Sequence, residues 1–214
     1  MRVAFYTSGK SGRLVDFYKW IRYSDYPFEF CYYDGNDKRI IDILKCSSPN
    51  AIIYEPSFQD LHVKSSIFSQ KLSDEILLKL EEHYVDYLFC FGDKLLKGDL
   101  LKKYKGRIIN FHPSLLPAFP GLNAVDKALD KKVKFLGNTA HIVDAGIDTG
   151  QIILQSILKI SDFHNYSDLL NQQLIMLRFI WDCLDRKEIT IFGSEGFILN
   201  PKFEPTYSIQ LLSF

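Results

Sequence analysis

The chain has 214 residues, 47% of them hydrophobic and 24% charged, which is typical of a globular protein and excludes a mainly disordered one. Lysine plus arginine and aspartate plus glutamate each number 26, so no overall basic charge favours nucleic acid as a partner. No apolar run is suited to span a bilayer or to serve as a signal peptide, so we expect a cytoplasmic protein with no membrane partner.

Short apolar runs alternate with amphipathic stretches, which predicts an α/β fold with a mostly parallel twisted sheet flanked by helices. In chain order, strands are expected at residues 2–7, 28–33, 51–54, 87–90, 107–111, 134–143, 151–160 and 189–192. Helices are expected at residues 14–23, 37–46, 73–84, 95–104, 123–131 and 163–186, with Ser73 capping the third of them. No linker interrupts this pattern, so we predict a single domain over residues 1–192 and a tail, residues 193–214, that packs on it.

The four cysteines, Cys31, Cys46, Cys90 and Cys183, are scattered through apolar stretches. A zinc site needs closely spaced ligands, but these cysteines form no C-x-x-C pair and have no neighbouring histidine. We therefore expect reduced, buried thiols and no metal site.

A glycine-bearing turn, residues 7–13, joins the first predicted strand to the first predicted helix. Such a turn presents backbone N–H groups and the positive end of a helix, which suit a phosphate, and Lys10 and Arg13 add positive charge. The turn matches neither G-x-G-x-x-G nor a Walker motif, so a plain connection between strand and helix is the alternative interpretation.

The most informative segment is the predicted strand at residues 107–111 together with the proline-rich loop after it. Successive side chains of a strand point to opposite faces, so Asn110 and His112 share one side. Pro113 gives no N–H to a sheet, so the strand should end there and leave an amide and an imidazole at its carboxyl end. Open α/β sheets bind their ligands at this end.

Asp148, in a turn rich in aspartate and glycine, supplies a third group. When an amine attacks an acyl carbon, the carbonyl oxygen gains negative charge and the nitrogen loses a proton. Asn110 and a protonated His112 can donate to that oxygen, and Asp148 can hold the imidazolium and take the proton. These residue types predict acyl transfer to an amine without a covalent intermediate on the protein. A plain turn at Asp148 is the alternative.

Two motifs, Asn-x-His-Pro-Ser-Leu-Leu-Pro from Asn110 and a later run from His141 to Asp148 and Gly150, have the order and spacing of a known family. They resemble the folate-dependent formyltransferases of the glycinamide ribonucleotide transformylase type, whose catalytic core is shared with sugar N-formyltransferases. The resemblance implies a Rossmann-like formyltransferase fold, with Asn110, His112 and Asp148 as the catalytic residues. It also implies 10-formyltetrahydrofolate as the formyl donor and no metal.

The resemblance places the folate in the back half of the domain. One folate-binding segment occupies the place of the family's pterin-facing loop, with Lys94 where the family has arginine and Asp93 where it has an apolar residue. Together the implied folate-binding residues are Phe91, Gly92, Asp93, Lys94, Leu95, Leu96, His141, Val143, Asp144, Ala145 and Gly146.

The acceptor side, in the front half, departs from the family. The sequence has Ser11-Gly12-Arg13 where the ribonucleotide enzyme usually has Gly-Ser-Asn, Asn123 in place of histidine, and Gln173 in place of glutamate. The implied acceptor-binding residues are Ser8, Gly9, Lys10, Ser11, Gly12, Arg13, Pro113, Asn123 and Gln173.

These departures bear on which primary amine is formylated. The guanidinium of Arg13 favours additional phosphate charge, so we slightly favour the diphosphate of an amino-sugar nucleotide. The alternative is glycinamide ribonucleotide (GAR), which is formylated in de novo purine biosynthesis. A second alternative is a folate- or nucleotide-binding protein without turnover. The partner is in each case a small molecule, and the oligomeric state stays open, with a homodimer as one option.

Overall fold

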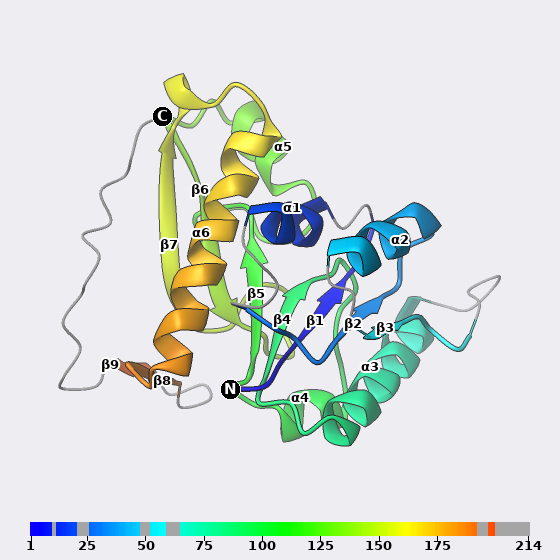
Figure 1. The fold of residues 1–214 in the computed structure, drawn as a ribbon. Helices are drawn as coiled ribbons and strands as arrows, with labels where there is room; N and C mark the ends of the chain where they lie inside the picture. Colours follow the sequence, from blue (N-terminus) through cyan, green and yellow to red (C-terminus); the bar gives the residue numbers. More distant parts are fainter. Residues whose placement is uncertain (10–11, 21–25, 48–51, 59–64, 192–196, 200–214) are drawn as a thin grey trace.

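A twisted sheet forms the centre of the molecule (Figure 1). The computed structural model describes residues 1–9, 12–20, 26–47, 52–58, 65–191 and 197–199. Within them a seven-stranded sheet has the order β3-β2-β1-β4-β5-β6-β7. Its strands are β1 Val3–Thr7, β2 Phe30–Tyr33, β3 Ile52–Tyr54, β4 Tyr87–Phe91, β5 Ile108–His112, β6 Phe135–Ile142 and β7 Ile152–Lys159. The strands β1 to β5 are parallel, while β5 and β6, and β6 and β7, pair antiparallel, so the prediction of a mostly parallel sheet is confirmed.

Helices cover both faces of the sheet (Figure 1). They are α1 Gly12–Trp20, α2 Lys38–Ser47, α3 Ser65–Glu82, α4 Asp99–Lys103, α5 Ala124–Asp130 and α6 Tyr166–Asp185, with a short 3₁₀ helix at Ile160–Asp162. Buried residues of α1, α2 and α6 form one core cluster against the sheet, and those of α3 and α4 form a second one. The predicted α/β fold with helices on a central sheet is therefore confirmed.

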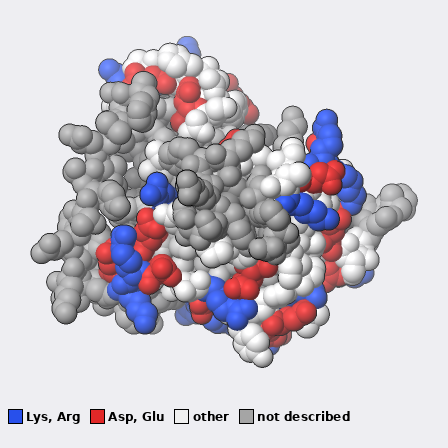
Figure 2. All heavy atoms as spheres, in the orientation of Figure 1, with Lys and Arg blue, Asp and Glu red and all other residues white. Residues whose placement is uncertain are grey.

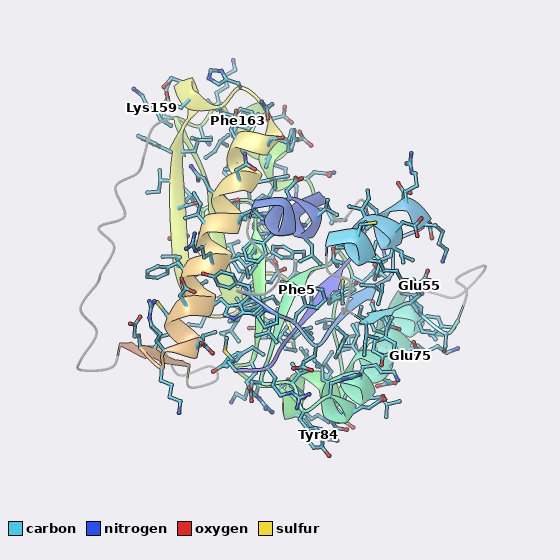
Figure 3. The ribbon with its side chains drawn as sticks, in the orientation of Figure 1. Phe5, Glu55, Glu75, Tyr84, Lys159 and Phe163 are labelled. Carbon is cyan, nitrogen blue, oxygen red and sulfur yellow. The ribbon has the colours of Figure 1, made fainter. Side chains whose placement is uncertain are left out.

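Side-chain alternation in the buried strands explains these two layers. In β1, Val3 and Phe5 belong to the cluster under α1, α2 and α6, while Ala4 and Tyr6 belong to the cluster under α3 and α4. Phe5, labelled in Figure 3, has its ring centroid 5.9 Å from that of Trp181 on α6. A strand that is buried on both faces is apolar at every position, so it is recognisable as an unbroken hydrophobic run.

The helix α3 begins eight residues before the predicted start, so the prediction that Ser73 caps it is wrong. Ser73 lies inside the helix, fully buried, where its hydroxyl donates to the carbonyl of Ser69 over 2.7 Å. The same hydroxyl accepts from the backbone N–H of Lys97 over 2.8 Å. A serine can satisfy its hydroxyl on the preceding helical turn, and here that local bond outweighs the preference for a cap.

The remaining differences lie in the connections. The helix predicted at residues 95–104 is reduced to α4, since the chain first turns at Gly98, whose φ is +66°. The strand predicted at residues 189–192 is β8 Ile189–Ile191, and it pairs antiparallel with β9 Phe197–Leu199, which was not predicted. Most of the tail predicted at residues 193–214 falls outside the described residues.

The cysteines are all unpaired, as expected, but Cys46 is exposed rather than buried. It lies near the end of the amphipathic helix α2, where the polar side faces outward. No helix of the described residues is long and apolar enough to cross a membrane. On the face shown in Figure 2, basic and acidic side chains lie close to one another over the lower edge, in keeping with their equal numbers.

Candidate active site

The strand β5 places two functional side chains at its carboxyl end. It ends at His112, directly before Pro113, as the sequence predicts. Ile109 and Phe111 point into the core cluster under α6, so alternation directs Asn110 and His112 to the opposite face of the strand. On the neighbouring strand β6, His141 is the register partner of Asn110.

Asp148 reaches this end of β5 from the loop between β6 and β7. Its Oδ2 lies 3.2 Å from Nδ1 of His112 and accepts the backbone N–H of Gly121 over 2.7 Å. The backbone of Asp148 is left-handed, with φ +53°, a conformation that aspartate tolerates better than most residues. A Cβ at Gly150 would lie 1.7 Å from the carbonyl oxygen of Ile142, so only glycine lets the loop return this close to β6. The structure thus brings Asn110, His112 and Asp148 together.

His141 connects Asn110 to Asp148. Its Nδ1 donates to the carbonyl of Ile142 over 2.9 Å, because a carbonyl oxygen only accepts. Its Nε2 lies 3.2 Å from Nδ2 of Asn110 and 3.5 Å from Oδ1 of Asp148. The neutral ring can therefore accept from Asn110, and a ring with a second proton can donate to Asp148. The motif spacing identified His141, but sequence reasoning placed it with the folate and missed this bridging position.

Both ring nitrogens of His112 face acceptors. Nε2 donates to the carbonyl of Phe119 over 2.9 Å, and Nδ1 faces the carboxylate of Asp148. Burial lowers the pKa of His112, and the hydrogen bond to Phe119 and the charge of Asp148 oppose this effect without reversing it. The ring is therefore mainly neutral at neutral pH, whereas the sequence led us to expect a protonated His112. The reason is that its side chain is only 8% exposed.

Asp148 is held in its charged form. Burial alone would raise the pKa of this carboxyl group, but the neighbouring ring of His141, the hydrogen bond from the Gly121 N–H and the neighbouring ring of His112 lower it below its usual value. The pair thus combines an ionised carboxylate with a neutral imidazole. If Nδ1 gains a proton, Asp148 lies beside it to accept a hydrogen bond, and the Phe119 carbonyl already accepts from Nε2. The site is therefore preorganised for the imidazolium.

The loop after Pro113 is tied to the sheet by hydrogen bonds. Ser114 donates its hydroxyl to the carbonyl of Ala118 over 2.7 Å. The hydroxyl of Thr139 on β6 donates to the carbonyl of Ser114 over 2.7 Å and accepts from the N–H of Leu116 over 3.0 Å. These bonds fix the segment that carries Phe119 and Gly121, the backbone partners of His112 and Asp148, and so hold the two side chains in place.

The first segment that the resemblance assigns to folate binding lies partly in the core. The side chain of Phe91 is buried and stacks on Phe111, with ring centroids 5.0 Å apart, so it does not line an open site as expected. Leu96 is likewise buried under α3 and α4. A Cβ at Gly92 would lie 2.0 Å from the Tyr6 ring, which requires glycine at this close approach. Leu95 and the ion pair of Asp93 with Lys94 are exposed.

The second segment that the resemblance assigns to folate binding is open to solvent. Residues 144–147 are exposed, and Asp144 accepts the N–H of Gly146 over 3.0 Å and the hydroxyl of Thr149 over 2.7 Å. Val143 is partly buried and donates its N–H to the carbonyl of Ile108. An Asp side chain that caps its own loop fixes the backbone and leaves the other peptide groups of the segment, Ala145 included, facing outward.

The residues that the resemblance assigns to acceptor binding fall into two groups. Gly9 and Asn123 are exposed, Ser8 and Pro113 are partly exposed, and Gly12 begins α1. Lys10 and Ser11 lie outside the described residues. Arg13 and Gln173 instead face inward, where Nη1 of Arg13 donates to Oε1 of Gln173 over 2.9 Å. The expectation that Arg13 grips a phosphate directly is not met in this structure, because its donors are turned to the protein.

A buried pair at the same edge of the sheet was not identified from the sequence. Tyr6 of β1 donates its hydroxyl to Oδ2 of Asp34, directly after β2, over 2.9 Å. Oδ1 of Asp34 is buried and makes no hydrogen bond in the described structure. Burial raises the pKa of Asp34 to about 6. A single aspartate after a strand carries no signal of such burial, since most are solvated.

Comparison with known proteins decides the family. Residues 1–176 match the family model described as formyl transferase. The chain belongs to the formyl transferase family. The resemblance that the two motifs carry is thereby confirmed. Among the described residues, no group of three or more histidines, cysteines and carboxylates is placed to hold a metal ion.

Relatives within the formyl transferase family have names that concern purine biosynthesis. The chain is 39% identical to phosphoribosylglycinamide formyltransferase of Bacillus subtilis (strain 168) over 147 residues, 65% of this chain and 74% of that protein. It is 42% identical to the human trifunctional purine biosynthetic protein adenosine-3 over 84 residues, 39% of this chain and 8% of that protein. The crystal structure of glycinamide ribonucleotide transformylase 1 from Symbiobacterium toebii matches with a TM-score of 0.78 and 25% identity, over 94% of each chain.

These names revise one expectation. The formyltransferase class and the Rossmann-like formyltransferase fold are confirmed, but the relatives favour the alternative acceptor, GAR, over the amino-sugar nucleotide. The preference for a sugar nucleotide rested on the charge of Arg13, which the structure turns inward.

Proposed function

We propose that this formyl transferase is a phosphoribosylglycinamide formyltransferase, which transfers the formyl group of 10-formyltetrahydrofolate to the primary amine of GAR. The observation that carries the proposal is the chain of contacts from Asn110 through His141 and Asp148 to His112 at the end of β5. The identity of 39% to a protein of that name supports the choice of acceptor. In this proposal the front half of the domain binds the acceptor and the back half binds folate.

The exposed peptide groups of residues 144–147 fit a folate, because a pterin carries N–H donors and a carbonyl acceptor along one edge. Asp144 would keep this segment in shape, and the side chains of Leu95 and Lys94 would lie on the solvent side. Bound 10-formyltetrahydrofolate would supply an activated formyl carbon. Every other requirement of the reaction falls on the residues of the chain.

Asn110 would stabilise the negative charge that develops on the formyl oxygen. Its amide nitrogen carries two hydrogens, and His141 engages one of them, which orients the group and leaves the other for the oxygen. His112 and Asp148 would take the proton that the attacking amine releases, and the imidazolium would return it to the folate nitrogen that leaves when its bond to the formyl carbon breaks. Nδ1 of His112 is the base, and the resulting imidazolium would be held between Asp148 and the Phe119 carbonyl.

An activity assay tests this function directly. The purified protein is incubated with 10-formyltetrahydrofolate and GAR, and the absorbance of released tetrahydrofolate is followed while the acceptor is weighed by mass spectrometry. We expect tetrahydrofolate and N-formylated GAR in equal amounts. A panel of amino-sugar nucleotides is run in parallel. Formylation of a sugar nucleotide and not of GAR would overturn the choice of acceptor, and binding of both substrates without turnover would make the chain a binding protein.

A further inference from the structure

A buried guanidinium lies behind the catalytic strand. Arg13, the second residue of α1, donates from Nη1 to Oε1 of Gln173 over 2.9 Å and from Nη2 to the carbonyl of Phe91 over 3.1 Å. Nη1 also lies 3.4 Å from the carbonyl oxygen of Phe111, the residue between Asn110 and His112. The guanidinium stacks over the Phe91 ring, 4.9 Å from its centroid. Its position therefore lies between the start of α1 and β5.

None of these partners is negatively charged. Among the described residues Arg13 contacts only carbonyl oxygens, an amide oxygen and an aromatic ring. Burial lowers the pKa of Arg13 to about 10, so the guanidinium remains protonated at neutral pH. A buried charge without a counter-ion costs free energy. We therefore expect a charged guanidinium at this position to have a function that offsets the cost.

Gln173 holds the guanidinium without neutralising it. It is fully buried, and its Nε2 donates to Oδ1 of Asn138 over 2.9 Å. Asn138 in turn donates from Nδ2 to the carbonyl of Leu169 over 2.9 Å, which fixes Oδ1 as the acceptor. The amide oxygen of Gln173 must therefore face Arg13. A glutamate has the same shape and would form an ion pair here, so the neutral amide preserves the positive charge.

We infer that Arg13 determines the acceptor's charge class: its uncompensated charge, held in place by Gln173, favours an acceptor that carries a phosphate. The charge acts across the start of α1 as a field and not through a hydrogen bond to the ligand, because both Nη atoms already donate to oxygens of the protein. Arg13 and Gln173 are in direct contact, which makes them one unit. The inference rests on the proposed function and adds that the charge of Arg13 selects the acceptor.

The decisive variant is Gln173→Glu, which adds a carboxylate beside Arg13 and keeps the acceptor atom. We expect kcat/KM for GAR to fall about tenfold, as for the loss of one unscreened charge near a protein surface. The dephosphorylated nucleoside of GAR should keep its kcat/KM within about twofold, and so should the folate donor. Gln172→Glu is the matched control, since Oε1 of Gln172 accepts from the Ser156 hydroxyl and places the same charge one residue away.

The ratio of kcat/KM for GAR to that for its nucleoside separates this role from a structural one. If Gln173→Glu lowers both values equally, Arg13 only braces the fold and the inference is wrong. If it changes neither, the charge has no effect on the acceptor and the inference is again wrong. Arg13→Lys keeps the charge, so the ratio of kcat/KM for GAR to that for its nucleoside should stay at the wild-type value. In Arg13→Met this ratio should fall, and the melting temperature of each variant is measured alongside.

Binding of inorganic phosphate, measured by titration calorimetry, needs no turnover. We expect Gln173→Glu to bind phosphate about tenfold more weakly than the wild type, with Gln172→Glu unchanged. If Gln173→Glu binds phosphate more weakly but the wild type does not formylate GAR, the proposed function is wrong and the role of Arg13 stands. In that case Gln173→Glu should also lower kcat/KM for a sugar nucleotide about tenfold. Equal phosphate binding by the wild type and Gln173→Glu would overturn the role of Arg13.

Discussion

Nδ1 of His112 lies 3.2 Å from Oδ2 of Asp148, and the imidazole is neutral while the carboxylate is ionised. A neutral ring beside a carboxylate is prepared to receive a proton rather than to give one. This relationship supports the proposal that His112 is the base that receives the amine's proton and that Asp148 stabilises the imidazolium.

The loss of either Asn110, the proposed oxyanion donor, or His112, the proposed base, should reduce turnover. We expect His112→Ala and Asn110→Ala each to lower kcat by about two to three orders of magnitude, because contacts made only in the transition state are lost. The KM for the folate donor should change little. Steady-state kinetics check this, with His164→Ala, an exposed histidine, as the control. A value of kcat within threefold of wild type for His112→Ala would contradict the mechanism.

The proton-accepting pair should give the pH profile an acid limb. Since burial lowers the pKa of His112 below the ordinary histidine value, kcat should fall only at pH values below that ordinary value, where the ring is already protonated and cannot accept a proton. Asp148→Asn removes the negative charge that supports the imidazolium, so the limb should move to still lower pH and kcat should drop by about two orders of magnitude. An unchanged profile with full turnover would reduce Asp148 to a turn-forming residue.

His141 should act by positioning Asn110 and not by binding folate. We expect His141→Ala to lower kcat about tenfold, because the amide of Asn110 loses the partner that orients it. The KM for the folate donor should stay within twofold. Substitution with glutamine, whose side-chain oxygen can accept from Asn110, should restore part of the activity. An increase in the folate KM at unchanged kcat would instead support the role in folate binding that the sequence suggested.

Asp34 should destabilise the protein at neutral pH. Its folded pKa of about 6 is above the ordinary 3.8, so the folded state binds more protons in that window and stability falls as the pH rises through it. Asp34→Asn keeps an acceptor for Tyr6 and removes the buried charge, so it should raise the free energy of unfolding by about 2 kcal/mol at pH 7.5 and by little at pH 4. Urea denaturation at both pH values measures this.

The exposed Asp42 on α2 supplies the control for that experiment. Asp42→Asn should leave the free energy of unfolding unchanged within about 0.5 kcal/mol at both pH values. A loss of stability in Asp34→Asn at pH 7.5 would mean that the carboxylate is needed by the fold and that its burial is compensated.

The strands β1, β4 and β5 could be predicted from the sequence because they are buried at nearly every position. β1 and β4 are apolar at almost every position, and β5 also ends at a proline, so their limits were within one or two residues. The start of α3 was missed because Ser73 carries the signal of a cap but forms its hydrogen bond one turn back in the helix. Local sequence patterns indicate where helices and strands form, but tertiary contacts determine which hydrogen bond a residue such as Ser73 makes.

Only the part of the site that depends on residues close together in the sequence, or on a motif, could be predicted. Alternation along one strand put Asn110 and His112 together, and the motif added Asp148. The contact between Arg13 and Gln173 joins positions 160 residues apart, and no pattern in the sequence shows whether a guanidinium turns to a ligand or to an amide. The same holds for Tyr6 and Asp34, which approach each other only because β1 and β2 are neighbours in the sheet.

Transfer of an isotopically labelled formyl group is the most direct test of the central claim. The protein is mixed with 10-formyltetrahydrofolate that carries ¹³C in the formyl group and with GAR, and the label is followed by NMR. We predict that the label moves to the amine of GAR in the wild type and remains on the folate when Asp148 is replaced by asparagine. Release of the label as formate, with none on the amine, would contradict formyl transfer to an amine at this site.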